Sequence, residues 1–207
     1  GVTIVQYYEL IIHIQVLAFN KEEDINNLFK LYNRQLGSMK KILLISFLFI
    51  VFVNTSHAQK EKYQSLFIYN FTKYIKWPDS YNSGKFVIGV IGNSPIIESI
   101  NSMVVSKKKT KAGSVIEVKA YASIDEIGDC NILFVSEDAV DILGQIDDKM
   151  AAKPILIITD SPGMATQGSV INFVEKDGKF KFELNESNAS SRGLVVSGSL
   201  TSLAILI

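Results

Sequence analysis

The sequence predicts an α/β domain: a three-layer sandwich with a mostly parallel sheet, an antiparallel hairpin at one edge and helices on both faces. Unbroken apolar runs of strand length indicate strands covered on both faces, and they occur at residues 86–91, 130–135 and 154–158. Helical patterns separate these runs, which favours parallel pairing. Further on, Asp177-Gly178 stands between two alternating segments and indicates a hairpin.

Residues 39–58 have the three parts of a secretory signal peptide. A short basic start at residues 39–41 leads into a twelve-residue apolar run, and Ser56 and Ala58 fit a peptidase site. We expect cleavage after Ala58 and export of a single domain at residues 59–207. A membrane-spanning helix is the alternative, but such a helix needs roughly 20 apolar residues.

Residues 1–38 precede this signal and contain no methionine. Because a signal peptide works near the N-terminus, we expect this segment to be a non-native or mis-started extension. A short helical arm is the alternative. We therefore expect residues 59–207 to carry the function.

The composition of residues 59–207 excludes several classes of function. Their net charge is about −1, which argues against nucleic acid as a partner. Both histidines, His13 and His57, lie outside the domain, so neither a Ser-His-Asp mechanism nor a histidine metal site can form there. We expect a non-catalytic protein with no cofactor and no metal. The single cysteine, Cys130, opens an apolar strand and is expected to be a buried small side chain, the alternative being a reactive thiol.

The domain is expected to open with an amphipathic helix at residues 60–77, which Pro78 ends. Asn70 is the polar member of its apolar stripe; it either ties a neighbouring backbone segment to the helix or contacts a partner or ligand. The stripe recurs at three- and four-residue steps and comprises Tyr63, Leu66, Phe67, Asn70, Phe71, Tyr74 and Ile75.

The first strand ends in a glycine turn. Gly89 and Gly92 follow a Gly-x-x-Gly pattern, and Ser94 with Pro95 suits the start of the next helix. The pattern is a weak match to a nucleotide-binding loop, because the three-glycine fingerprint and its downstream carboxylate are missing.

The middle of the domain continues the alternation. The basic run at residues 107–111 predicts a solvated turn, and the one-sided strand at residues 116–120 predicts a position near a sheet edge. Ser123 and Glu126 have capping-box spacing, and residues 137–150 have a helical pattern.

Asp160 follows a buried strand, where open α/β sheets often bind ligands. A hydrogen-bonding turn residue is nevertheless the better interpretation of one aspartate. Residues 170–175 and 180–184 form the expected hairpin, and residues 189–207 are expected to form an apolar closing helix interrupted by glycines.

Several stretches between residues 63 and 207 form a recognisable set in their order and spacing. They are the helix ending in Trp77-Pro78, the strand with Gly92, the strand of residues 130–135, the set Asp160, Met164, Gly168, Ile171 and Phe173, residues 182–185, and Gly193-Leu194. Together these stretches resemble the YfiR-like family of periplasmic proteins. Asn131 stands where the family often has histidine, Ser169 replaces its second glycine, and the cysteine that partners Cys130 in some members is missing.

The resemblance implies a non-catalytic regulator. It implies that the protein binds the periplasmic part of an inner-membrane diguanylate cyclase, linked to cyclic-di-GMP, or of a sensor kinase. We also expect the regulator to be a homodimer. We expect the partner to bind the exposed side of residues 60–77 and the closing helix, although single contact residues cannot be assigned from the sequence.

Two other functions remain open. A small-molecule sensor or carrier would bind its ligand in a cleft near Gly92, Ser136 and Asp160. An exported hydrolase would need an acid pair such as Asp129 with Asp160, which nothing in the spacing favours.

Overall fold

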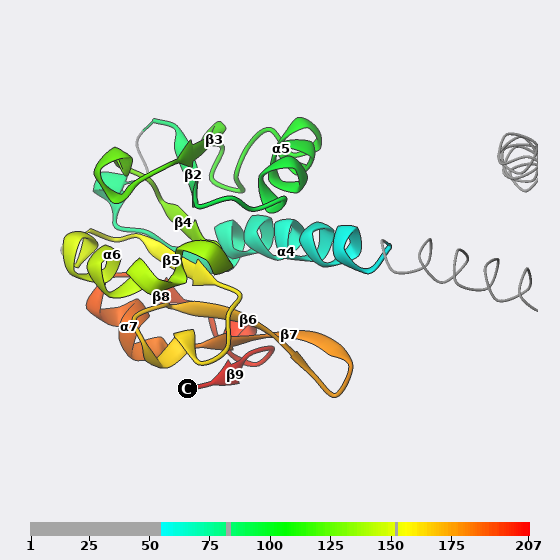
Figure 1. Ribbon diagram of the computed structural model, residues 1–207. Coiled ribbons are helices and arrows are strands. Elements are labelled where there is room, and N and C mark those ends of the chain that lie inside the picture. The colour runs from blue at the N-terminus through cyan, green and yellow to red at the C-terminus, as the bar shows by residue number, and fades with distance from the viewer. Residues whose placement is uncertain (1–54, 82–83, 152) are drawn as a thin grey trace, which may run out of the picture. The chain divides into compact units, whose positions relative to one another are not determined.

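A computed structural model describes residues 55–81, 84–151 and 153–207 (Figure 1). Residues 1–38 and the predicted signal peptide up to residue 54 lie outside them. The helices are α4 (Thr55–Tyr74), α5 (Ile96–Ser106), α6 (Leu143–Met150), α7 (Glu186–Ser191) and α8 (Gly198–Thr201), with short 3-10 helices η1 (Asp79–Tyr81), η2 (Ile124–Glu126), η3 (Glu137–Ile142) and η4 (Met164–Thr166). The strands are β1 (Ile75–Lys76), β2 (Phe86–Ile91), β3 (Ile116–Tyr121), β4 (Ile132–Val135), β5 (Leu156–Thr159), β6 (Ile171–Lys176), β7 (Lys179–Leu184), β8 (Val195–Val196) and β9 (Ile205–Leu206).

Seven strands form the central sheet in the order β3-β2-β4-β5-β6-β7-β9. The first five pair in parallel, β7 is antiparallel to β6, and β9 is parallel to β7. The predicted fold class is thus confirmed, and the strand expected near an edge is the edge strand β3. The hairpin is not quite outermost, because the short strand β9 follows it.

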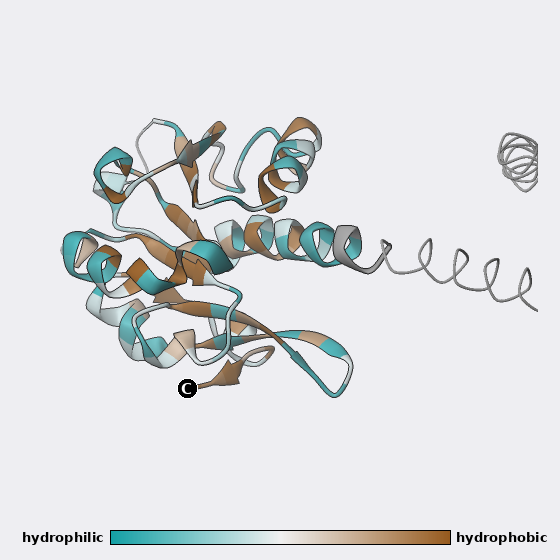
Figure 2. Ribbon diagram, viewed as in Figure 1, coloured by the Kyte–Doolittle hydropathy of each residue, from teal (hydrophilic) through white to brown (hydrophobic). Residues whose placement is uncertain are grey.

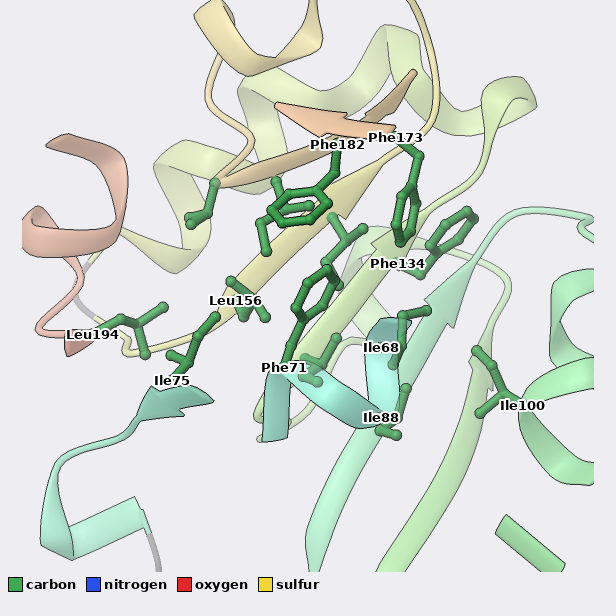
Figure 3. Packing of buried hydrophobic residues seen from close by; sticks show 14 of the residues in the cluster. Ile68, Phe71, Ile75, Ile88, Ile100, Phe134, Leu156, Phe173, Phe182 and Leu194 are labelled. Atoms are coloured by element: carbon green, nitrogen blue, oxygen red, sulfur yellow. The ribbon is translucent and has the colours of Figure 1, made fainter. Parts of the chain in front are cut away.

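Helices cover both faces of the sheet, since its strands are apolar on both sides. On one face, α4 and α5 pack on alternate strand residues, with Ile68, Phe71 and Ile100 fully buried. Figure 3 shows Ile68 and Phe71 pointing into the aliphatic and aromatic side chains of this layer. On the other face, η3 and α6 supply Leu143 and Ile146. The hydropathy colouring in Figure 2 shows the central strands as the most apolar part of this unit.

The buried face of the first helix is rotated by about one residue relative to the apolar stripe that the sequence predicts. The buried face of α4 carries Gln64, Ser65, Ile68, Phe71 and Thr72. Tyr63, Leu66 and Tyr74, which the sequence places inside, are instead exposed. The sequence pattern is ambiguous because apolar side chains occur on two sides of this helix, and polar Gln64 and Ser65 are buried through hydrogen bonds.

The predicted closing helix at residues 189–207 is wrong. Gly193, with φ of 70°, stands after α7, and a β-branched pair follows as strand β8. This strand pairs antiparallel with β1, and β9 then joins the main sheet. Apolar composition in this region therefore reflects short strands and helices rather than one helix.

The Asp177-Gly178 hairpin is confirmed. Asp177 has φ of 56° and Gly178 has φ of 64°, the two positive values that a two-residue turn between twisted strands requires. The register pairs Lys176 with Lys179 and Phe173 with Phe182.

Residues 137–150 are helical as expected, in η3 and α6. The capping box is only half formed, because Ser123 makes no side-chain cap whereas Glu126 accepts a hydrogen bond from the backbone nitrogen of Ala122. Among the helices that the structure describes, none is both long enough and apolar enough to cross a bilayer.

Candidate functional site

The glycine turn after β2 is filled by the protein's own side chains. Gly92 has φ of 92°, and the Asp138 carboxylate accepts a hydrogen bond of 2.9 Å from the backbone nitrogen of Asn93. The Ser136 hydroxyl, which has one proton to donate, lies within hydrogen-bond distance of two acceptors, the Ile91 carbonyl oxygen at 2.8 Å and the Asp138 carboxylate. A carboxylate thus occupies the place where a nucleotide-binding loop would hold a phosphate.

Packing explains both glycines of the Gly-x-x-Gly pattern. A Cβ on Gly89 would lie 2.5 Å from the ring of Tyr121, which covers this point of β2. A Cβ on Gly92 would overlap the Ser136 hydroxyl. The turn is a structural element, and Gly92 and Ser136 do not line the groove described below.

Asp160 ties the start of α4 to the end of β5. Its Oδ2 accepts a hydrogen bond of 3.0 Å from Gln64 Nε2 and forms an ion pair of 2.8 Å with Lys60. Its Oδ1 is buried without a hydrogen-bond partner within the part of the chain that the structure describes. Asp160 is thus a hydrogen-bonding residue, but its partners are side chains of α4 rather than the groups of its own turn that the sequence suggests.

Asp129 and Asp160 do not form an acid pair. Asp129 precedes β4, whereas Asp160 follows β5, and these strands run in parallel. The two carboxylates therefore lie at opposite ends of the sheet, and Asp129 is paired with Lys153 at 2.9 Å. The acid pair considered for an exported hydrolase is thus contradicted. In the described ranges, no group of three His, Cys, Asp or Glu side chains is arranged to hold a metal ion.

Asn131 is buried just before β4, where its hydrogen bonds link three segments of the chain. Its Oδ1 accepts from the backbone nitrogen of Val87 at 2.8 Å, and its Nδ2 donates to the Tyr81 carbonyl at 3.2 Å. Its own carbonyl accepts from the indole nitrogen of Trp77 at 3.1 Å. The neighbouring Cys130 is buried, and burial raises the pKa of its thiol to about 12. Cys130 is therefore buried, as expected from the sequence.

A groove of about 1010 Å³ lies between the first described turns of α4 and the β6–β7 hairpin. Tyr63 and Phe180 form an aromatic wall, and Asp160 with Lys60 lies at the end near β5. Of the three residues around which the sequence predicts a cleft, only Asp160 lines this groove. The hairpin side of the groove could not be predicted locally, because it is brought to α4 by tertiary packing.

The exposed side of α4 is apolar and basic. Tyr63, Leu66 and Tyr74 are 46%, 42% and 40% exposed. The exposed lysines Lys62 and Lys73 flank them. The helix has one acidic residue, Glu61, which is buried. Asn70 is half-buried and accepts a hydrogen bond from Lys73 at 3.0 Å, so it forms a local contact rather than the expected tie to another backbone segment.

These features define an α/β domain with an apolar helix face and an adjoining groove on its surface. The chain belongs to the YfiR/HmsC-like family, whose family model matches residues 61–205. The resemblance seen in the sequence motifs is thereby confirmed. This family is one of periplasmic regulators rather than catalysts, and it is associated with membrane signalling proteins.

No curated protein matches the chain. A solved structure similar to it is that of the ABC domain in complex with L-Trp from Streptococcus pneumonia, at 16% identity and a TM-score of 0.41. The similarity covers 58% of this chain and 54% of that chain, so this chain spans about half of the length of its structural relative.

Proposed function

We propose that this protein is an exported regulator that controls an inner-membrane diguanylate cyclase or sensor kinase by binding its periplasmic part. The family supports the class of function. The observation that carries the proposal is the exposed face of α4, where Tyr63, Leu66 and Tyr74 offer apolar contact area to a partner. Exposed aromatic side chains of this kind are enriched in binding interfaces.

The charge on α4 favours an acidic partner surface. Lys62 and Lys73 are exposed beside the apolar side chains, while the only carboxylate of the helix is buried. Such charges steer association and orient the partner more than they add affinity. Regulation follows if one conformation of the receptor binds this face more tightly than the other, since only differential affinity shifts an equilibrium.

The test is capture of a named partner with the full chain carrying a C-terminal tag, from detergent-solubilised envelopes of the source cells. Mass spectrometry should identify a membrane cyclase or sensor kinase, and deletion of the chain should change cyclic-di-GMP or the kinase output. Capture of neither class, with folded bait, contradicts the proposal. The expected homodimer is tested by light scattering on the purified chain.

Small-molecule binding in the groove is the second candidate function. Its volume of about 1010 Å³ is at the upper end of the range for ligand pockets, and it combines an aromatic wall with the Asp160 carboxylate. A ligand held there should raise the melting temperature of the wild-type protein. The same ligand should have a smaller effect on Phe180→Ala, which removes part of the wall.

A further inference from the structure

The outer edge of β7 is only partly covered by another strand. In a hairpin with a two-residue turn, the pair that flanks the turn exchanges hydrogen bonds, and pairs then alternate along the ladder. Lys176 and Lys179 flank this turn and therefore form a hydrogen-bonded pair. The next pair, Glu175 and Phe180, is a pair whose backbones do not hydrogen-bond to each other. The backbone N–H and C=O of Phe180 therefore point outward, away from β6.

Strand β9 does not reach Phe180. It pairs with β7 only at Glu183 and Leu184, through Ile205 and Leu206. In Figure 1 the hairpin tip extends beyond the short strand β9. Within the described residues, the backbone of Phe180 has no turn, loop or side-chain hydrogen bond either. One strand-edge donor and one acceptor remain available at this point.

The side chains give the open edge two chemically different faces. Phe180 and Phe182 point to the α4 side, where Phe180 stacks on Phe173 with ring centroids 5.2 Å apart. Lys179 and Lys181 alternate with them and point to the other side. Among the described residues, neither lysine forms an ion pair. The edge is thus apolar on one face and basic on the other.

The two lysines argue against a second copy of this chain as the occupant. Antiparallel pairing of two β7 edges about Phe180 would set Lys179 of one copy opposite Lys181 of the other. Like charges directly opposite each other destabilise a strand pair. Edge lysines commonly protect sheets from such self-pairing. A strand with carboxylates at the facing positions would be stabilised by the same charges.

We propose that the open edge of β7 binds an extended acidic segment of the partner protein, in which apolar residues alternate with Asp or Glu, by strand addition. The apolar residues would pack beside Phe180 in the groove, and the carboxylates would face Lys179 and Lys181. This inference rests on the proposed function in taking the partner to be a protein that the chain regulates.

Amide exchange on the full chain tests the edge directly. The probe is a capped peptide of about eight residues that alternates valine with glutamate, a length typical of strands. It should slow exchange at the Phe180 amide, which points outward, and leave the Lys181 amide unchanged, because that amide already bonds within the hairpin. No change at Phe180 under saturating peptide overturns the proposal.

Charge reversal of the two edge lysines is a second test, and it has a matched control. Lys179→Glu with Lys181→Glu should weaken peptide binding on the order of tenfold, because two favourable cross-strand pairs become repulsive. Lys107→Glu with Lys108→Glu changes the net charge equally at exposed positions elsewhere and should bind as the wild type does. Equal weakening by both variants, or tighter binding of a valine–lysine peptide, contradicts the proposal. Wild-type chain that self-associates through β7 also contradicts it.

Peptide binding to the β7 edge and capture of the membrane partner are two separate measurements. Strand addition and the proposed regulatory function can therefore be contradicted independently. A captured cyclase or kinase that leaves the Phe180 amide unprotected overturns strand addition and leaves the proposed function intact. Protection by the acidic peptide without any captured signalling protein supports the edge and contradicts the proposed function.

Discussion

The ring of Tyr63 stacks on the ring of Phe180, with centroids 6.4 Å apart and planes inclined by 28°. Tyr63 belongs to the exposed face of α4, and Phe180 belongs to the open edge of the β6–β7 hairpin. Phe67 extends the contact inward, 6.0 Å from Phe180 between centroids. The helix face, the groove and the hairpin edge are therefore one continuous surface supported by aromatic packing.

Gly92→Ala should destabilise the domain strongly. The new Cβ would overlap Ser136 at a φ that alanine rarely adopts, so we expect a loss of about 3 kcal/mol or more. Gly113 is the matched control, because it has φ of 93° and no atom within 4 Å of the added Cβ. Gly113→Ala should cost only about 1 kcal/mol. Urea unfolding measures both, and equal losses would refute steric overlap at Gly92.

Asp160→Ala should destabilise the domain by about 1–3 kcal/mol, because it leaves the buried amide of Gln64 without an acceptor. The half-exposed Lys60 adds little to this effect. Combining Asp160→Ala with Gln64→Ala should cost less than the two single losses together, with a coupling of about 1 kcal/mol. If the losses in the free energy of unfolding, measured in urea, are additive, the hydrogen bond between Gln64 and Asp160 does not contribute to stability.

Asp138 should stabilise the folded state only when ionised. The Ser136 hydroxyl, and then the Asn93 backbone N–H, hold the pKa of Asp138 below its usual value of 3.8. A lowered folded-state pKa contributes stability above the unfolded-state value, and that stability is lost as the pH falls through the folded-state value. Asp138→Asn should therefore lower the melting temperature at neutral pH and have a smaller effect at about pH 2.5. A difference that is constant with pH would rule out a contribution from the charge.

Cys130 should resist alkylation in the native protein. Its thiol is buried with a pKa raised to about 12, so almost no thiolate is present or reachable near neutral pH. Iodoacetamide labelling should be roughly a thousandfold slower than in the denatured chain, where the fully exposed thiol serves as the control. Native labelling at the denatured rate would restore the reactive-thiol interpretation.

The sheet and the hairpin were predictable because their signals are local. Apolar runs specify strands buried on both faces, and Asp177-Gly178 supplies the two positive φ values of the turn. The closing segment does not follow from the sequence, because β8 and β9 are two-residue strands held by tertiary pairing with β1 and β7. Such short strands carry no periodicity of their own.

The surface was predictable only in part. The sequence points to Asp160 and to the first helix, but it misplaces the helix face by about one residue. The rotation of α4 about its own axis is fixed by Gln64, which donates a hydrogen bond to Asp160, 96 residues further along the chain. The aromatic wall likewise depends on a tertiary contact between α4 and the hairpin. No local sequence pattern predicts either of these two tertiary contacts.

The regulatory role of the α4 face is tested by quantitative capture of the membrane signalling protein with matched variants of the full chain. Leu66→Glu places a carboxylate in the exposed apolar face of α4, whereas Val105→Glu makes a comparable change on α5, at a side chain that is 73% exposed. We predict that Leu66→Glu lowers capture by roughly tenfold or more while Val105→Glu does not, with unchanged melting temperatures. Equal capture of an identified cyclase or kinase by both variants and the wild type would contradict the assignment of the α4 face as the regulatory surface.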